Sequence, residues 1–374
     1  MTTVVLSSNT AWSLFNFRGG IIRAILARGF RVIALAPEDS FSSKLAKMGC
    51  DVMDIRMNNT GTNPLSDLRT LLAYYSVYRR IKPDIILHFT IKPVIYGSIS
   101  ARQLGIPCVN MITGLGSVFI RDTWVTRLVQ ILYRFALGRS QKTIFQNPDD
   151  LRLFVDRGLV PQMRALRFPG SGIDVSAFSA QPAIGRDYQV FILIARMLWD
   201  KGVGVYVDAA RELKMRHPKA TFHLLGSIDE MKETGIKREQ IEKWVGEGVV
   251  EYLGEADDVR PHIAGSDCVV LPSYYREGVP RSLLEAAAMS RPVITTDSVG
   301  CREAVDDGVT GYLCKVKDSV DLADKMERIM TLSGEQRAEM GRNGRLKMER
   351  EFDEQIVIRR YLEIIDEIIV KGRA

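Results

Sequence analysis

The sequence lacks the features that mark a membrane-spanning, secreted or metal-binding protein. Its 374 residues contain no run of 18 apolar residues, so no spanning helix is expected. The start, "MTTVVLSSNTAW", has no charged n-region and predicts a first strand instead of a signal peptide. The five cysteines have no paired spacing, and we expect reduced thiols in a cytoplasmic protein. The four histidines lie far from any cysteine cluster, so no zinc site is expected.

Glycine-rich signatures for dinucleotides are incomplete. The segment "FRGGIIRAIL" (17–26) has only two adjacent glycines, and "GLGSVF" (114–119) lacks the third glycine of G-x-G-x-x-G. A nicotinamide cofactor is therefore not expected. Gly19 and Gly20 are predicted to open a first helix over 19–28, either as a phosphate-cradling turn or as a tight packing turn.

Charge is distributed unevenly along the chain. Residues 1–180 hold 22 Lys and Arg against 11 Asp and Glu, a net charge of +11, whereas the remainder holds 29 against 34, a net charge of −5. The basic first half predicts an anionic partner, such as nucleic acid, an anionic membrane surface or a phosphorylated substrate. No nucleic-acid-binding motif accompanies this charge, so nucleic acid is not an expected partner.

Short apolar runs alternate with amphipathic segments, as in "TTVVLSS", "RVIALAP" and "PDIILHF", and the rhythm restarts at "YQVFILIAR". This alternation predicts parallel sheets covered by helices. The length favours two α/β domains of the doubly wound, Rossmann-like class, 1–178 and 187–354, with a linker at 179–187 and a cleft between them. The amphipathic helix 355–374 is expected to cross back to the first domain. Such sheets bind ligands at the carboxyl ends of their strands.

The stretch "REGVPRSLLEAAAMSRPVITTD" (276–297) places two glutamates around a helix start. Glu277 follows a buried strand, Pro280 suits the first turn, and Glu285 lies about a turn and a half further on. The helix N-terminus would attract an anion, Gly278 would let it approach the backbone, and the carboxylates would accept hydrogen bonds from hydroxyl groups. The alternative is a helix cap with one exposed glutamate.

A second segment, "IARMLWDKG" (194–202), supplies two cations at another strand end. Arg196 and Lys201 follow an apolar strand and precede a predicted helix. A guanidinium fork and an ammonium group in that position would suit a diphosphate. The alternative is a solvated pair of charges.

Taken together, these residues resemble the retaining glycosyltransferases of family 4, which have the GT-B fold. The resemblance covers nearly the whole chain and includes "PGSGID" (169–174), similar to the segment that precedes the second domain in that family. Two longer stretches, "YREGVPRSLLEAAAMSRPVITTDSVGCREAV" and "TIKPVIYGSISARQLGIPCVNMITGLGSVF", resemble one branch more closely. That branch contains bacterial polyprenyl-diphosphate N-acetylgalactosaminyltransferases and related capsule and O-antigen enzymes.

The resemblance implies roles for the matching residues. Glu285 would bind the ribose hydroxyls of a UDP-sugar, and Glu277 the hydroxyls of its sugar. Arg196 and Lys201 would neutralise the departing diphosphate and, with Glu277, form the catalytic group. Further donor contacts are implied for Gly19, Gly20, Gly278, Val279, Pro280, Arg281, Ser282, Gly254 and Asp258. The Asp-x-Asp triplet of the other glycosyltransferase fold is absent, which agrees with an enzyme that needs no metal or cofactor.

The chain departs from the family on the acceptor side. Many members have a histidine after a first-domain strand, whereas residues 111–114 here are "MITG". The acceptor-side candidates are His88, Thr90, Lys92 and Thr113, and a satisfied core histidine is the alternative for His88. We assign no general base, because a leaving phosphate oxygen can take the acceptor proton in the implied mechanism.

Two segments of the basic half, 68–82 and 121–139, combine apolar and aromatic residues with arginines. Helices of this composition can lie in a membrane interface or attract the diphosphate of a polyprenyl-linked acceptor. The alternative is that they pack on their own core.

The expected protein is a metal-independent hexosyltransferase, cytoplasmic and peripheral to the inner face of the cell membrane. It would move a hexose or N-acetylhexosamine from a UDP-sugar to a polyprenyl-diphosphate-linked saccharide. N-acetylgalactosamine is the sugar that the resemblance suggests, with galactose and glucose open. The alternatives are a UDP-sugar 2-epimerase-like enzyme and a non-catalytic nucleotide-sugar-binding protein.

Overall fold

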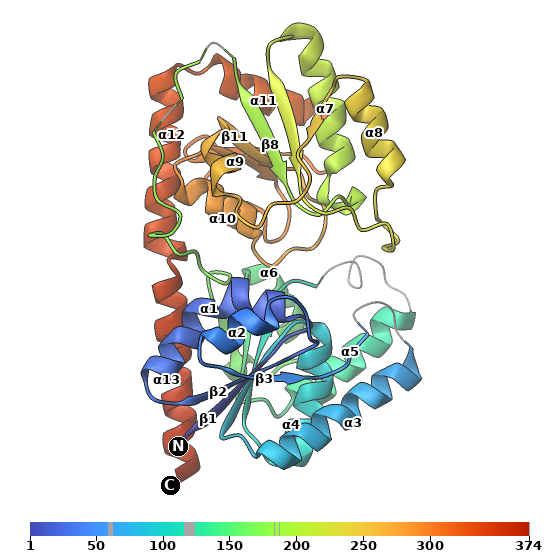
Figure 1. Ribbon diagram of the computed structural model, residues 1–374, viewed down its shortest axis with the longest axis vertical. Coiled ribbons are helices and arrows are strands. Elements are labelled where there is room, and N and C mark those ends of the chain that lie inside the picture. Colours follow the sequence, from blue (N-terminus) through green and yellow to red (C-terminus); the bar gives the residue numbers. More distant parts are fainter. Residues whose placement is uncertain (59–62, 116–123, 183, 187, 374) are drawn as a thin grey trace. The chain divides into compact units, whose positions relative to one another are not determined.

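The computed structural model forms two compact units and describes residues 1–58, 63–115, 124–182, 184–186 and 188–373 (Figure 1). Unit 1 comprises Met1–Ser171 and Glu354–Ala374, and unit 2 comprises Gly172–Asp353. Residues 172–178, which the sequence analysis placed in the first domain, group with unit 2. Parts of the predicted segments 114–119, 121–139 and 179–187 lie outside the described residues.

Unit 1 is built on a parallel sheet whose described strands have the order β3-β2-β1-β4-β5-β6-β7. Side chains alternate between its two faces, so Val4 and Leu6 join one core and Val5 joins the other. The strands are β1 (Thr3–Ser7), β2 (Arg31–Ala36), β3 (Asp51–Asp54), β4 (Ile85–Phe89), β5 (Cys108–Ile112), β6 (Lys142–Phe145) and β7 (Ala165–Arg167).

Helices cover both faces of this sheet. One core contains side chains of α1 and of the C-terminal helix α13, including Val357, Tyr361 and Ile365. The opposite face packs against α3, α5 and α6. The predicted return of the last helix to the first domain is therefore confirmed. The helices are α1 (Ala11–Ala27), α2 (Ser42–Lys47), α3 (Pro64–Ile81), the π-helix η1 (Pro93–Gly97), α4 (Ser98–Gln103), α5 (Trp124–Leu137), α6 (Pro148–Asp156) and α13 (Glu354–Arg373).

Unit 2 repeats the plan with the strand order β10-β9-β8-β11-β12-β13, and its described ladders are parallel. The strands are β8 (Val190–Ile194), β9 (Thr221–Leu225), β10 (Glu251–Tyr252), β11 (Cys268–Leu271), β12 (Val293–Thr296) and β13 (Gly311–Cys314). The helices are α7 (Val203–Arg216), α8 (Arg238–Gly246), α9 (Arg260–Ala264), α10 (Arg281–Ala288), α11 (Ser319–Thr331) and α12 (Gly334–Lys347).

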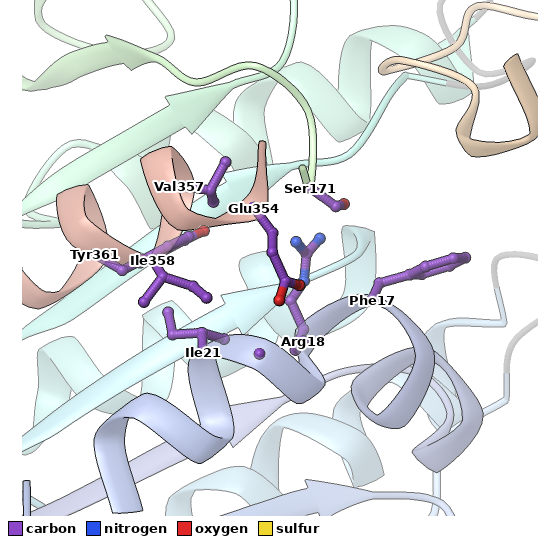
Figure 2. Close-up of a pocket in the computed structure, with 9 residues that line it drawn as sticks. Phe17, Arg18, Ile21, Ser171, Glu354, Val357, Ile358 and Tyr361 are labelled. Carbon is purple, nitrogen blue, oxygen red and sulfur yellow. The ribbon is translucent and has the colours of Figure 1, made fainter. Parts of the chain in front are cut away.

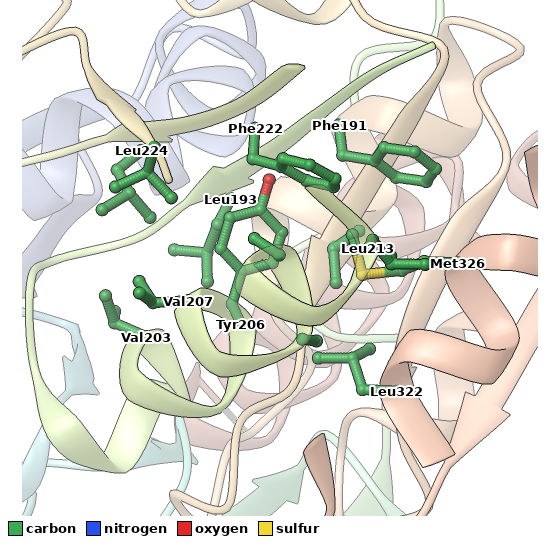
Figure 3. Packing of buried hydrophobic residues seen from close by; sticks show 14 of the residues in the cluster. Phe191, Leu193, Val203, Tyr206, Val207, Leu213, Phe222, Leu224, Leu322 and Met326 are labelled. Atoms are coloured by element: carbon green, nitrogen blue, oxygen red, sulfur yellow. The ribbon is translucent and has the colours of Figure 1, made fainter. Parts of the chain in front are cut away.

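An aromatic cluster fills one core of unit 2, between the sheet and the helices α7 and α11 (Figure 3). The rings of Phe191 and Phe222 stack with centroids 5.7 Å apart, and Tyr206 meets Phe222 edge-on. Burial of each side chain of this size stabilises the fold by about 1.5–3 kcal/mol relative to exposure. The other face packs against α9 and α10, so the predicted doubly wound architecture is confirmed in both units.

Helix α1 begins earlier than predicted, which changes the interpretation of Gly19 and Gly20. It starts at Ala11, because Thr10 caps it by accepting a hydrogen bond from the Ser13 amide at 3.1 Å. Both glycines therefore lie inside the helix and form no turn. A Cβ at Gly20 would lie 2.7 Å from the Glu354 carboxylate, which points toward α1 across a small cavity (Figure 2). This glycine provides room for the first residue of α13.

His88 of β4 is the centre of a buried polar network in unit 1. Its Nδ1 is 2.9 Å from Asn110 Oδ1, and its Nε2 is 2.8 Å from the Tyr78 hydroxyl. Since the Asn110 oxygen can only accept, Nδ1 carries the proton and Nε2 accepts from Tyr78. Burial lowers the pKa of His88 to about 3. The structure thus makes His88 a satisfied core histidine and contradicts its placement among the acceptor-side candidates.

Replacing Gly97 with alanine should test how rigid this network is. A Cβ at Gly97 would lie 2.4 Å from Nε2 of His88, whose ring is held from both sides. We expect Gly97→Ala to destabilise unit 1 by roughly 1–3 kcal/mol through overpacking, although alanine favours a helix. Thermal unfolding measures the effect.

The matched control is Gly19→Ala, where the added Cβ would meet the flexible ends of Arg23 at 3.4 Å and Met48 at 3.9 Å. That variant should unfold at or above the wild-type midpoint. Equal unfolding midpoints for Gly97→Ala and the wild type would mean that the His88 side chain can shift to accommodate the added Cβ at little cost in stability.

Candidate active site

The predicted donor residues lie where the direction of winding reverses in unit 2. Strand β8 lies between β9 and β11; the chain continues from β8 to β9 on one side and from β11 to β12 on the other. Open α/β sheets bind ligands outside the carboxyl ends of strands at this kind of position. Arg196 and Lys201 follow β8, and Glu277 follows β11.

The loops after β8 and β11 approach each other closely. Gly202, at φ +76°, lies so near the Pro272 carbonyl that an added Cβ would be 2.0 Å from its oxygen. The amides of Tyr274 and Tyr275 donate to the Asp200 carbonyl at 2.9 and 3.0 Å. Only glycine satisfies both the positive φ and the contact. The sequence analysis did not identify this position as part of the site, although the Gly before a helix in "WDKG" was a usable signal.

Lys201 and Glu277 form an ion pair across these two loops. Their side chains are 14% and 11% exposed, so the pair is largely shielded from water. Ser273 donates a hydrogen bond from Oγ to the same Glu277 oxygen at 3.0 Å. The pairing orients the lysine cation and one glutamate oxygen together, and the sequence analysis had not included Ser273.

The backbone after Glu277 is supported from the loop that follows β12. A Cβ at Gly300, at φ +81°, would lie 2.0 Å from the Gly278 carbonyl oxygen. Val279 and Pro280 then lead into α10, where Pro280 is the N-cap and has no side-chain oxygen to offer. Because α10 starts at Arg281, four residues after Glu277, its partial positive charge supports an anion site near that glutamate.

Glu285 lies in the second turn of α10 and accepts a hydrogen bond from Arg281 Nε at 2.9 Å. Its side chain is only 13% exposed. Burial raises the pKa of the Glu285 carboxyl, Arg281 opposes that rise, and the charge of Asp258 adds to it. Asp258 therefore lies close enough to interact with Glu285. Ser282, which lies with Arg281 in the first turn of α10, is half-buried.

The segment after β10 supplies the remaining donor-side candidates. Gly254, at φ +76°, accepts a hydrogen bond on its carbonyl from the Gly226 amide at 2.8 Å, which ties the ends of β9 and β10 together. Asp258 is about half exposed and pairs with Arg260 at 2.8 Å, and the hydrogen bond from Arg260 lowers its pKa. Arg260 thus holds this carboxylate ionised.

Arg196 is the most exposed of the predicted catalytic residues. Its side chain is 43% exposed, and a guanidinium nitrogen lies 3.9 Å from the Asp229 carboxylate. The charge of Arg196 also lowers the pKa of Tyr275, which burial raises, so Arg196 lies near the loop after β11. The structure thus groups the cations that follow β8 with the loop after β11.

The other acceptor-side candidates lie at the carboxyl edge of unit 1. Thr90 follows β4 at φ +67°, an uncommon conformation for a β-branched residue, and its buried Oγ1 has no hydrogen-bond partner among the described residues. Lys92 pairs with Asp67 of α3 at 2.7 Å, and both side chains are mostly buried. Thr113 follows β5 and is half-buried.

Two protein-family models match the chain, one within each unit. The model described as "Glycosyl transferase 4-like" matches residues 3–147, and the model described as "Glycosyl transferases group 1" matches residues 174–347. The chain is a glycosyltransferase. The family expected from the resemblance is confirmed, and the enzyme is a hexosyltransferase.

Named relatives of this glycosyltransferase act on lipid-linked saccharides. The N,N'-diacetylbacillosaminyl-diphospho-undecaprenol alpha-1,3-N-acetylgalactosaminyltransferase of Campylobacter jejuni is 27% identical over 379 residues, 97% of this chain and 98% of the relative. The UDP-Gal:alpha-D-GlcNAc-diphosphoundecaprenol alpha-1,3-galactosyltransferase of Escherichia coli is 24% identical and covers 71% of each chain.

Solved structures share the fold at low sequence identity. HepE of Anabaena, in complex with UDP and glucose, has a TM-score of 0.80 at 20% identity and covers 98% of this chain and 100% of its own. Sucrose-phosphate synthase of Thermosynechococcus elongatus has a TM-score of 0.81 at 17% identity and covers 99% of this chain and 100% of its own. These likenesses confirm the expected GT-B class of fold.

Replacing Glu285 with glutamine should make the stability of unit 2 less sensitive to pH. The raised pKa means that ionising Glu285 is harder in the folded than in the unfolded state. The contribution of protonated Glu285 to the free energy of unfolding is therefore full below a pH of about 4.5. It is lost as the pH rises through the folded-state pKa of Glu285. We expect wild-type stability, relative to Glu285→Gln, to fall as the pH increases from 4.5 to 8.

Chemical or thermal unfolding of both proteins at several pH values measures this difference. Glu339→Gln, at an exposed position of α12, is the control and should parallel the wild type. A constant difference between Glu285→Gln and the wild type across the range would contradict a raised pKa.

Proposed function

We propose that this glycosyltransferase moves a sugar from a UDP-sugar to a polyprenyl-diphosphate-linked saccharide, with retention of configuration and without a metal ion. The observation that carries the proposal is the grouping of cations and carboxylates at the reversal of winding in unit 2. The printed activities of the Campylobacter and Escherichia relatives support the acceptor class, and the UDP complex of HepE supports the donor class.

In this proposal the donor is held by opposite charges and by hydroxyl groups. Lys201 and Arg196 bind the diphosphate, assisted by the N-terminus of α10. Glu285 accepts hydrogen bonds from the ribose, and Glu277 accepts them from the donor sugar. The Lys201–Glu277 pair links these functions, since the residue that binds the phosphate also orients the carboxylate that binds the sugar.

The transfer step needs no protein base. An acceptor hydroxyl oxygen forms a bond to the anomeric carbon as the bond from that carbon to the β-phosphate oxygen breaks. The acceptor proton passes to the departing phosphate oxygen, and UDP leaves with the electron pair. Lys201 and Arg196 stabilise the negative charge that develops on the diphosphate, as preorganised cations do in other transfer reactions. This role of the cations is the reason to propose metal independence.

Thr90, Lys92 and Thr113 are the proposed acceptor-side residues. Thr90 and Lys92 follow β4, next to β1, where the winding of the unit 1 sheet reverses. The Thr90 hydroxyl offers an unused hydrogen-bonding group, and its backbone conformation costs about 1–3 kcal/mol in a residue of this type. N-acetylgalactosamine is the proposed donor sugar, on the strength of the Campylobacter relative.

The proposed partner of unit 1 is an anionic membrane surface at the inner face of the cell membrane. No helix among the described residues is long and apolar enough to cross a bilayer. Helix α5 nevertheless exposes an apolar stripe at helical spacing, and the first turns of α3 do the same. The exposed side chains are Trp124, Leu128, Ile131 and Phe135 of α5 and Leu65, Leu68 and Leu72 of α3.

Arginines accompany both stripes. Arg127 and Arg134 are exposed on α5, and Arg69, Arg79 and Arg80 are exposed on α3. Both helices pack against α4 on the same side of the sheet (Figure 1). An apolar face with flanking cations is the composition that lies in the headgroup region of anionic bilayers.

Replacing Glu285 with alanine should reduce transfer from the UDP-sugar by roughly 10- to 100-fold in kcat/KM, the loss expected when hydrogen bonds to a charged group are removed. Transfer from UDP-N-acetylgalactosamine to a panel of polyprenyl-diphosphate saccharides measures this. The control is Glu339→Ala, at an exposed position of α12, which should keep wild-type activity.

EDTA should leave the wild-type rate unchanged. Near-normal turnover of Glu285→Ala would contradict the donor assignment. An epimerised UDP-sugar formed without acceptor would instead indicate an epimerase, and saturable UDP binding without turnover on any acceptor would indicate a binding protein.

The variant Leu128→Asn/Ile131→Asn should bind vesicles of phosphatidylglycerol and phosphatidylcholine at least about tenfold more weakly, because two apolar side chains lose their burial. Co-sedimentation of the full chain measures this binding. Leu346→Asn, at an exposed leucine of α12 in unit 2, is the matched control. Failure of the wild type to co-sediment would contradict the membrane proposal and favour a soluble acceptor.

A further inference from the structure

The segment between β9 and α8 is paired through its backbone with the segment that follows β8. Met197 pairs with Ile228 and Leu198 pairs with Gly235 in isolated bridges. The Trp199 amide donates to the Thr234 carbonyl at 2.8 Å. Residues 226–236 are thus fixed against the loop that carries Arg196 and Lys201.

Two glycines make this contact possible. At Gly226, φ is +143°, and an added Cβ would lie 1.9 Å from the Ala195 carbonyl oxygen. At Gly235, an added Cβ would lie 2.1 Å from the Asp229 carbonyl oxygen. A larger residue at Gly226 would push the segment away from the end of β8, and a larger residue at Gly235 would open the turn formed by residues 229–235.

Lys232 lies in the turn that these contacts hold in place. Its amide donates to the Asp229 carbonyl at 3.3 Å, and its own carbonyl accepts from the Gly235 amide at 2.9 Å. Both backbone groups of Lys232 are therefore used inside the turn, and the position of its Cα is well defined. The residue as a whole is half-buried.

The surroundings of Lys232 are rich in positive charge. Burial lowers the pKa of Lys232, the charges of Arg196 and Lys201 lower it further, and only Asp229 opposes them. Among the nearby carboxylates, Glu277 is paired with Lys201 and Asp229 lies beside Arg196. Two cations and one carboxylate thus act on Lys232, an arrangement that an anionic ligand would stabilise.

We propose that Lys232 is a third cation of the donor site, which binds the diphosphate of a nucleoside diphosphate together with Arg196 and Lys201. The inference deepens the proposed function and rests on it. Residues 227–235 were outside the predicted site, because Lys232 is 31 residues from Lys201 and no motif joins them. Its role follows from the pairing of the two segments.

The first test measures the affinity of the purified full chain for UDP by calorimetry. Lys232→Met should weaken UDP binding about tenfold or more, whereas Lys232→Arg should retain most of it. Uridine, which lacks the phosphates, should bind both variants as it binds the wild type. The control is Lys237→Met, at an exposed lysine of the same region, which should not change either affinity.

The second test uses proton linkage. A bound diphosphate raises the lowered pKa of Lys232, so UDP binding to the wild type should take up protons at alkaline pH. Calorimetry above pH 8 in buffers of different ionisation enthalpy measures this uptake. Lys232→Arg should take up fewer protons, because arginine stays charged throughout.

The outcomes separate this inference from the proposed function. A wild type that does not bind UDP would overturn both. A wild type that binds UDP, with Lys232→Met of equal affinity, would overturn only the role of Lys232. Equal losses of UDP and uridine affinity in Lys232→Met would show that the lysine holds the segment in place and does not contact phosphate.

Discussion

The proposed donor site of unit 2 depends on one close approach, that of the loops after β8 and β11. Gly202 allows the first loop to touch the Pro272 carbonyl, and the amides of Tyr274 and Tyr275 then bond to Asp200. This backbone contact, and not the flexibility of long side chains, places Lys201 next to Glu277. The ion pair is largely shielded, so removal of one partner would leave a costly uncompensated charge.

The same site holds charges that oppose folding. The Glu285 carboxyl is buried beside a single arginine, and Lys232 is repelled by Arg196 and Lys201. Such groups reduce stability in the free protein and become favourable when a ligand supplies hydroxyl groups and negative charge. The rigid backbone around them, supported by Gly226, Gly235 and Gly300, keeps the groups from relaxing apart.

Unit 1 has the same doubly wound architecture as unit 2, but its polar side chains are arranged differently. Its central histidine is neutral and closed off by Tyr78 and Asn110, so His88 supports packing, not proton transfer. The unusual polar features of unit 1 lie instead at the strand ends, in Thr90 at φ +67° and in the mostly buried Lys92–Asp67 pair. Gly20 and Gly97 accommodate side chains of Glu354 and His88, whereas Gly202, Gly226 and Gly300 accommodate neighbouring backbone.

The sequence alone determined the doubly wound plan, the return of α13 to unit 1, and the placement of Arg196, Lys201 and Glu277 at strand ends, because periodicity and short-range spacing encode these features. Only the tertiary structure decided which segments distant in sequence meet. It buried His88, placed Gly19 and Gly20 inside α1, and joined Lys92 to Asp67 and the segment 228–235 to the loop after β8. Contacts between loops at one edge of a sheet depend on the order of the strands and on glycines that let two backbone segments come close together. No local sequence pattern specifies either.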